Sequence, residues 1–277
     1  MNIVEIIQNL KNLNAESFSP ALLKSLHLVT REGKINQDAA RKLKQVFHLF
    51  QHISPMLQEI FEKHQNPKLV DLGSGKAYLA FLLHEAVLAP LKRGEMTGVE
   101  SRPDLIARCQ ELTKAKSTST LHFQQSHIED FKAQDFHFIT ALHACDTATD
   151  DAIHLALKFE VPYLALVPCC QAEISRQFDE LKKGPLFPLW RLGTFSREFG
   201  SHLTNVYRAL LLEAHGYKVT VTEFTGWEHS LKNQLILARK HQRSNGLAIR
   251  QLKDLYNQIP VFPSHLKDDF SLLDSLK

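Results

Sequence analysis

Apolar residues recur at helical spacing in the first part of the chain. Within 3–10 they lie three or four positions apart, which predicts an amphipathic helix. A broad apolar face at the same spacing predicts a second helix over 36–64, which Pro55 is expected to kink or divide. Because Pro67 marks a boundary, residues 1–66 are predicted to form an N-terminal helical region.

From residue 68 onward, short apolar runs alternate with helical stretches. Buried strands are predicted at 68–73, 96–100, 121–125, 136–143 and 163–167. Strands that alternate with helices of about 10–15 residues indicate βαβ units and a parallel sheet. After a helix over 199–215, a hairpin-like pair of strands follows at 217–224 and 234–238. The predicted fold is therefore α/β and Rossmann-like, with a seven-stranded, mostly parallel sheet over 67–240.

The remaining segments are less regular. Residues 171–183 are predicted to be helical, whereas 184–198 is expected to be irregular because it contains Pro185 and Pro188. Residues 241–277 are expected to form a terminal helix followed by an extended, less ordered tail. The chain is thus predicted to comprise an N-terminal helical region, a central domain over 67–240 and a C-terminal helix and tail.

The composition is that of an ordinary globular protein of 277 residues with a formal net charge of +3. No apolar run approaches the roughly 20 residues needed to span a bilayer, and the first residues lack the order of a secretory signal, so a cytoplasmic protein is expected. The four cysteines form no CxxC pair, which argues against a zinc ribbon or a thioredoxin-type redox site.

Positive charge is concentrated between residues 24 and 44. Six basic side chains stand there against Glu32 and Asp38: Lys24, Arg31, Lys34, Arg41, Lys42 and Lys44. Such a segment is either a solvated helix face or a surface that meets phosphate groups. On the second interpretation, RNA is the expected partner.

The most informative segment is the loop after the first predicted strand. Its cofactor-binding candidates are Asp71, Gly73, Ser74, Gly75, Ala77 and Tyr78. The glycines allow a sharp turn that exposes backbone N–H groups to a ligand at a helix N-terminus. Dinucleotide sheets hold pyrophosphate with this arrangement. An acid at the end of the strand repels phosphate but suits the ammonium and sulfonium groups of S-adenosylmethionine, so methyl transfer is favoured over hydride transfer.

Two later strand ends supply further cofactor candidates. Glu100 ends the second strand, where a carboxylate can accept hydrogen bonds from ribose hydroxyls. After the third strand, Asp130 can accept from the adenine amino group, although Glu129 is an adjacent alternative. Either Ile128 or Phe131 can pack against the ring. Asp130 could equally be a helix cap. All three elements fall at carboxyl ends of strands, where open α/β sheets bind ligands.

The ends of strands four and five carry the candidate chemistry. These strands are expected to be neighbours, which brings His143, Asp146, Cys169, Cys170 and Gln171 close to the reacting methyl group. His143 is also a cofactor-binding candidate, and Gln171 a substrate-binding one. Further substrate-binding candidates lie in the loop between the last two strands: Trp227, Glu228, His229, Lys232 and Asn233.

Four stretches together carry a family resemblance: DLGSGKAYL, ALHACDTATDDAI, VPCCQ and GWEHSLKNQLI. They resemble a methyltransferase-like family of bacteria and eukaryotes, one eukaryotic branch of which carries a glutathione-S-transferase-like module. Within the second and third stretches, HACDTATD and CC also resemble elements of tRNA 2′-O-methyltransferases that act near the acceptor stem. Ala77 stands where the first family often has glycine, and Gln171 where the tRNA enzymes have histidine. No zinc-binding elements of those tRNA enzymes are found.

Three chemistries remain open. Asp146 or His143 can act as a base or orient the acceptor. A cysteine such as Cys169 can act as a covalent nucleophile, as in RNA cytosine-5 methyltransferases. Alternatively, His143, Cys145 and Cys169 ligate zinc, although local ligand spacing is missing and no metal is expected. If none applies, the cysteines simply pack the strand ends.

We therefore expect an S-adenosylmethionine-dependent methyltransferase whose acceptor is RNA (tRNA or rRNA) or a translation-associated protein. A catalytically silent scaffold that binds RNA or protein is the alternative, and a Rossmann oxidoreductase is a weaker one.

Overall fold

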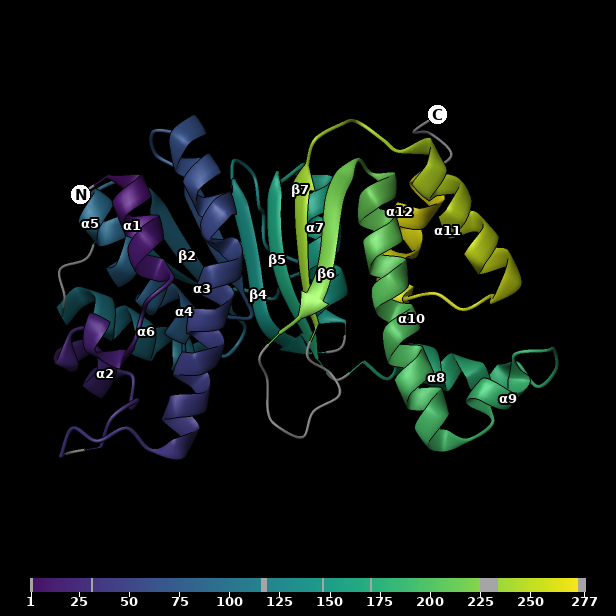
Figure 1. Ribbon diagram of the computed structural model, residues 1–277, viewed down its shortest axis with the longest axis horizontal. Helices are drawn as coiled ribbons and strands as arrows, with labels where there is room; N and C mark the ends of the chain where they lie inside the picture. Colours follow the sequence, from purple (N-terminus) through teal and green to yellow (C-terminus); the bar gives the residue numbers. More distant parts are fainter. Residues whose placement is uncertain are drawn as a thin grey trace.

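A computed structural model describes residues 2–30, 32–115, 119–145, 147–169, 171–224 and 234–273, without the side chains of residues 143–145. Within these residues one seven-stranded sheet forms the centre of the molecule, in the order β3-β2-β1-β4-β5-β7-β6 (Figure 1). Its strands are β1 (Lys68–Leu72), β2 (Glu95–Glu100), β3 (Leu121–Gln125), β4 (Phe138–Cys145), β5 (Tyr163–Cys169), β6 (Tyr217–Glu223) and β7 (Gln234–Lys240).

The pairing of the strands confirms the predicted fold class. Strands β1 to β5 pair in parallel, and β7 runs antiparallel to both β5 and β6. The carboxyl ends of the five parallel strands consequently meet at one edge of the sheet, at the lower side of Figure 1.

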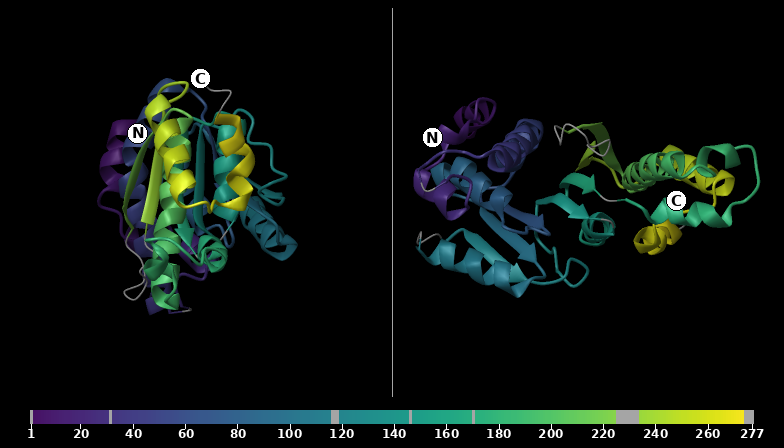
Figure 2. Two further views of the ribbon diagram at one scale, coloured as in Figure 1. Left: turned by 90° about the vertical axis from the view of Figure 1, so that its right-hand side faces the viewer. Right: turned by 90° about the horizontal axis from the view of Figure 1, so that it is seen from below.

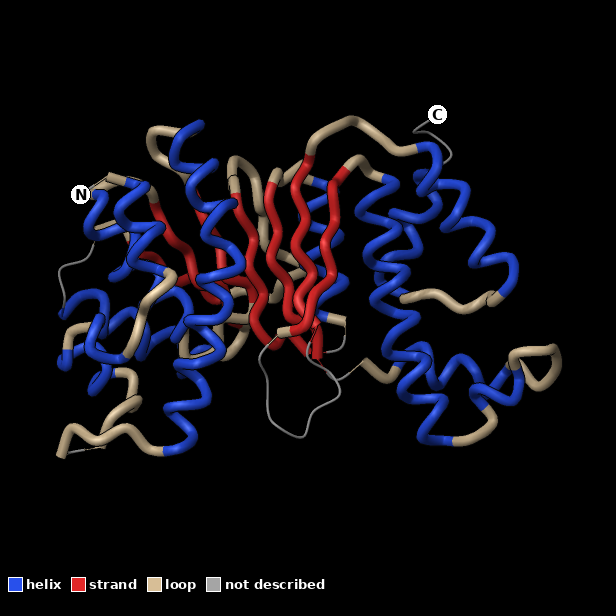
Figure 3. Tube along the Cα trace, viewed as in Figure 1, coloured by secondary structure: helices blue, strands red, loops and turns tan. Residues whose placement is uncertain are grey.

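Alternating side chains of the strands feed two cores, one on each face of the sheet. Helices from the first part of the chain pack on one core: α1 (Ile3–Leu10), η1 (Ala15–Ser17), α2 (Pro20–Ser25), α3 (Gln37–Lys63), α4 (Tyr78–Leu83), the π-helical turn η2 (His84–Leu88), α5 (Ala89–Leu91) and α6 (Pro103–Ala115). They lie on the left of Figure 3.

Later helices pack on the second core: α7 (Ala148–Lys158), α8 (Glu173–Gln177), η3 (Phe178–Glu180), α9 (Phe187–Trp190), α10 (Gly193–Ala214), α11 (Gly246–Gln258), η4 (Ser264–Leu266) and α12 (Lys267–Ser271). Helix α11 packs along α10, and η4 packs against α7 (Figure 2). In the described parts of the chain, no helix is long and apolar enough to cross a membrane.

Three expectations about local structure are wrong. Of the two effects expected of Pro55, division of the helix is wrong: α3 runs unbroken past it, and its apolar face, including Ile53 and Leu57, is fully buried. Helix α10 begins at Gly193, inside the segment expected to be irregular. There Trp190 stacks on Phe178 with ring centroids 4.8 Å apart and fixes the preceding turn.

The C-terminal segment is the third correction. Residues 259–273 are not an extended tail, because Phe262 and Leu266 are buried in the second core. The Tyr207 hydroxyl donates a hydrogen bond to the Ile259 carbonyl at 2.9 Å and holds the start of the segment. This order comes from tertiary contacts that no local sequence pattern reveals.

Candidate cofactor and active site

The loop between β1 and α4 turns sharply through three residues with left-handed backbone. Gly73, Gly75 and Ala77 have φ values of 68°, 56° and 56°. Glycine adopts this conformation at no steric cost, whereas Ala77 pays about 1–2 kcal/mol for its Cβ. The Ala77 methyl group is fully buried, which offsets part of that penalty. The loop therefore folds as a tight cradle although its third small residue is not glycine.

Glu100, at the end of β2, fastens this loop. Its Oε2 accepts a hydrogen bond from the Gly75 N–H at 2.9 Å, and its Oε1 accepts from Arg102 Nε at 3.0 Å and the Arg102 N–H at 3.1 Å. Burial by itself would raise the pKa of Glu100, but the hydrogen bonds from Arg102 and Gly75 outweigh it and lower the pKa. Glu100 is thus held as a carboxylate.

Asp71 lies one strand away in different surroundings. It is 2% exposed, and it stands opposite Gly98 on β2 and Thr140 on β4 in the sheet register. The Thr140 hydroxyl lies 3.1 Å from Asp71 Oδ1 and 3.2 Å from the Val70 carbonyl, so its single proton is shared between two acceptors. Burial raises the pKa of Asp71 to about 7, against the weaker lowering effect of Thr140.

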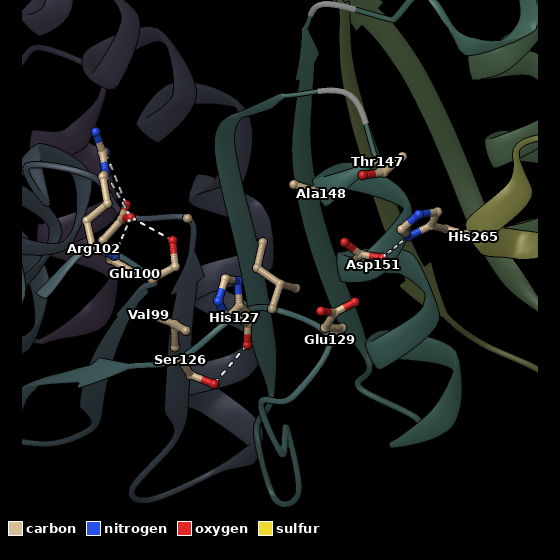
Figure 4. Close-up of a pocket in the computed structure, with 13 residues that line it drawn as sticks. Val99, Glu100, Arg102, Ser126, His127, Glu129, Thr147, Ala148, Asp151 and His265 are labelled. Atoms are coloured by element: carbon tan, nitrogen blue, oxygen red, sulfur yellow. Dashed lines mark hydrogen bonds and ion pairs between the residues drawn. The ribbon is translucent and has the colours of Figure 1, made fainter.

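A cavity of about 450 Å³ opens beside these two strand ends. The lining comes from the end of β2, the loops after β1, β2, β3 and β4, the start of α7 and the C-terminal segment. Its residues are Gly73, Val99, Glu100, Ser101, Arg102, Ser126, His127, Ile128, Glu129, Thr147, Ala148, Asp151 and His265. Figure 4 shows Glu100 and Arg102 on one wall and Thr147, Ala148, Asp151 and His265 on the facing wall. This is the carboxyl edge at which parallel sheets bind ligands.

The structure sorts the predicted cofactor residues by position. Gly73, Glu100 and Ile128 line the cavity. After β3 the acidic residue in the lining is Glu129, whereas Asp130 is exposed outside the lining. The other predicted residues of the first loop are not part of the lining. Among these, the Ser74 hydroxyl oxygen is buried and has no hydrogen-bond partner within the described residues.

Two further predicted residues, Tyr78 and Asp71, also lie outside the cavity lining. Tyr78 begins α4, and Lys42 Nζ lies 5.4 Å from the centroid of its ring. Asp71 is likewise outside the cavity lining, although the strand that carries it leads directly to Gly73.

The ends of β4 and β5, where the reacting groups were expected, lie next to each other in the sheet. Cys145 and Cys169 are paired positions in the ladder between β4 and β5, after a register shift that follows Leu142. Cys169 is half-buried. The side chain of His143 lies outside the described part of the structure. The same holds for these predicted residues as a whole: Asp146, Cys170, Trp227, Glu228, His229, Lys232 and Asn233.

Gln171, expected to meet the substrate, is 4% exposed and belongs to a buried polar network. Its amide NH₂ can donate to the Ser201 carbonyl at 2.8 Å while its oxygen accepts from Arg208 at 3.2 Å. Arg208 in turn donates to both carboxylate oxygens of Asp150, at 2.7 and 2.9 Å. The network connects the end of β5 to α10 and to the first turn of α7. It fixes the backbone that carries Cys169 and Asp151.

Sequence reasoning missed three residues that shape the site: Arg102, Thr140 and His265. Arg102 follows Glu100 by two positions, and a basic residue so near a strand-end acid is a signal that could have been used. Thr140 and His265 reach Asp71 and Asp151 only through the strand register and the path of the C-terminal segment. Their separations in sequence leave no local pattern.

The side chains that line the cavity suit a nucleoside with a positive charge. The cavity presents the carboxylates of Glu100, Glu129 and Asp151 together with the apolar side chains of Ile128 and Ala148, and its volume is that of a small-molecule site. Glu100 retains lone pairs for ribose hydroxyls beyond those that Arg102 and Gly75 use. Among the residues with described side chains, no group of three or more His, Cys, Asp or Glu is placed to hold a metal ion.

Comparison with known proteins agrees with this geometry. Residues 41–177 match a family described as a methyltransferase domain. The chain is 26% identical to the human glutathione S-transferase C-terminal domain-containing protein over 146 residues, which is 52% of this chain and 21% of that protein. To the cattle protein of the same description it is 26% identical over 230 residues, or 75% and 34% of the two chains. The chain thus spans only a fifth to a third of these relatives.

Among solved structures, a methyltransferase from Podospora anserina with bound S-adenosylhomocysteine is 14% identical, with a TM-score of 0.45 and coverage of 81% and 89% of the two chains. Magnesium protoporphyrin IX methyltransferase from Synechocystis is 12% identical, with a TM-score of 0.45 and coverage of 85% and 100%. The family match and the 3-2-1-4-5-7-6 sheet lead to one assignment. Residues 41–177 carry an S-adenosylmethionine-dependent methyltransferase domain of the class I architecture.

Proposed function

We propose that the domain transfers the methyl group of S-adenosylmethionine to RNA, with tRNA or rRNA as the acceptor. The observation that carries the proposal is the position of the basic half of α3. This half lies next to the cofactor loop, because Lys42 of α3 stacks over Tyr78 at the start of α4. Cations and cofactor therefore share one edge of the molecule.

The electrostatics of Asp38 show how densely the cations gather. A hydrogen bond from Lys42 at 2.5 Å, followed by the charges of Lys42, Arg41 and Lys76, lowers the pKa of Asp38. Lys76 belongs to the cofactor loop and Arg41 to α3, so two separate elements contribute. Lys24, Lys34 and Lys44 are exposed on the same basic segment.

Such a cluster suits the phosphate backbone of RNA, since neutralising phosphates releases counterions and favours binding. When bound, S-adenosylmethionine would supply an electrophilic methyl group. The contribution of this chain is to hold the nucleoside at Glu100 and to orient the acceptor beside the ends of β4 and β5. The resemblance of 143–150 and 169–170 to elements of tRNA 2′-O-methyltransferases makes tRNA the first acceptor to test.

The test is a tritium-transfer assay with labelled S-adenosylmethionine on size-fractionated RNA and on protein from cells that lack the gene. We expect label in RNA that ribonuclease removes and protease does not. Label only in protein would overturn the RNA proposal. No transfer to either fraction, with intact S-adenosylhomocysteine binding, would favour a catalytically silent scaffold.

A charge-matched pair of variants tests the basic surface. Arg41→Gln with Lys44→Gln removes two positive charges beside the cofactor loop, and Lys92→Gln with Lys158→Gln removes two exposed charges at the opposite edge of the sheet. We expect the first pair to weaken RNA binding about tenfold in low salt and to reduce its salt dependence. The second pair should behave like the wild type; equal loss in both would contradict a localised RNA surface.

A further inference from the structure

One wall of the cofactor cavity comes from outside the matched domain. His265 of η4 lines the cavity next to Asp151 of α7, and its Nδ1 lies 2.6 Å from Asp151 Oδ1 (Figure 4). The hydrogen bond to Asp151 raises the pKa of His265, with further contributions from the charges of Asp151, Asp150 and Glu173. The contact therefore favours the protonated form of His265 at the edge of the site.

The segment that carries His265 is fastened to the domain at several points. We call residues 259–273 the C-terminal strap. Phe262 N–H donates to Gln177 Oε1 at 3.0 Å, and Ser264 N–H donates to Glu173 Oε1 at 2.9 Å. A second histidine–carboxylate pair joins His154 Nδ1 to Asp269 Oδ2 at 2.9 Å. His154 and Asp269 do not line the cavity.

We propose that the C-terminal strap is part of the cofactor site, with His265 as a positioning residue that holds the Asp151 carboxylate toward the bound nucleoside. A carboxylate accepts several hydrogen bonds, and His265 uses one of these positions. Asp151 thus keeps acceptor capacity for a hydroxyl or amino group of the ligand. Without His265, Asp151 is free to change rotamer and the wall at this side of the cavity is lost.

A thermodynamic consequence follows from this arrangement. A ligand that contacts the wall built by the strap binds more tightly when the strap is docked, so ligand binding and docking must stabilise each other. The strap should then be better protected from hydrogen exchange when the cavity is filled. This coupling concerns the cofactor alone and does not depend on RNA being the acceptor.

The experiment compares the two histidine–carboxylate pairs by calorimetry with S-adenosylhomocysteine. His265→Ala breaks the pair in the cavity and His154→Ala breaks the pair outside it, with side chains of closely similar exposure, 38% and 36%. We expect His265→Ala to raise the Kd about fivefold, and His154→Ala, which loosens the strap but removes no side chain from the cavity, to raise it only about twofold. His265→Asn, which can still donate to Asp151, should recover most of the affinity.

Hydrogen–deuterium exchange on the wild type gives a second readout. Amides of 259–273 should exchange more slowly after S-adenosylhomocysteine is added. The proposal is overturned if His265→Ala binds like the wild type, if both alanine variants weaken binding equally, or if the strap gains no protection. Since each arm uses only the cofactor product, a failure of RNA methylation leaves this result unaffected.

Discussion

Asp71 and Glu100 occupy corresponding regions at the ends of two neighbouring parallel strands, and both side chains are buried. The pKa values of the two carboxyl groups are nevertheless shifted in opposite directions. Burial raises the pKa of Asp71 to about 7, whereas the pKa of Glu100 is lowered although burial opposes the change. Depth in the protein is therefore not what separates the two carboxylates.

The number of donors around each group accounts for the difference. Glu100 receives the Arg102 guanidinium and two backbone N–H groups, while the donor found for Asp71 among the described residues is one hydroxyl shared with a carbonyl. A carboxylate with several donors stays ionised in a low-dielectric site, and one with few donors is driven toward the neutral form. The cavity lining thus contains one carboxylate whose ionised form is favoured, and a second, buried carboxylate outside the lining responds to pH near neutrality.

The largest effect is expected for Glu100→Gln. Hydrogen bonds to a charged acceptor contribute about 1.5–3 kcal/mol each, so losing the carboxylate that meets the ribose should weaken S-adenosylhomocysteine binding by about 100-fold. Isothermal titration calorimetry measures this directly. Glu95→Gln, at the other end of the same strand, is the control and should bind normally. Similar affinity in the two variants would remove Glu100 from the binding site.

Asp71→Asn is expected to stabilise the fold of the free protein. Because the folded-state pKa of Asp71 is raised above its unfolded value, ionising this residue destabilises the fold. The penalty is absent below about pH 4, grows as the pH rises toward 7 and is complete above it. The substitution should therefore raise the free energy of unfolding by up to about 4 kcal/mol at pH 8 and leave it unchanged at pH 4.

Urea denaturation at the two pH values measures the difference, with Asp254→Asn on the exposed face of α11 as the control. The same variant should lose affinity for cationic S-adenosylmethionine at pH 8, since the negative charge is gone. A stability gain that is equal at both pH values would show that Asp71 does not titrate in this range.

The acidic residues of the site show which features can be predicted from the sequence. Asp71 and Glu100 were predicted as site residues because each follows an apolar run that ends beside glycine or a helix start. Glu129 rather than Asp130 lines the cavity, because the direction of a side chain in a turn depends on backbone angles that composition does not specify. Local pattern therefore locates a strand end but not the residue that faces the ligand.

The residues that contact these carboxylates cannot be predicted from local sequence. Thr140 meets Asp71 through the register of β1 and β4, and His265 meets Asp151 across more than a hundred residues of chain. Neither contact follows from periodicity or motif. The fold can be predicted because alternating strands and helices have few possible arrangements. The pKa values cannot be predicted from the sequence, because they depend on these contacts.

The smallest effect is expected for Arg102→Ala. The Arg102 side chain is 62% exposed, so its ion pair with Glu100 should contribute at most about 1 kcal/mol to stability. Removing the guanidinium leaves the two backbone donors in place but raises the pKa of Glu100. Binding of S-adenosylhomocysteine should then fail at a higher pH than in the wild type as the solution is acidified, with little change at pH 8. Titrating Kd against pH tests this, with Arg250→Ala as the control; coincident acid limbs would mean that the backbone N–H groups alone keep Glu100 ionised.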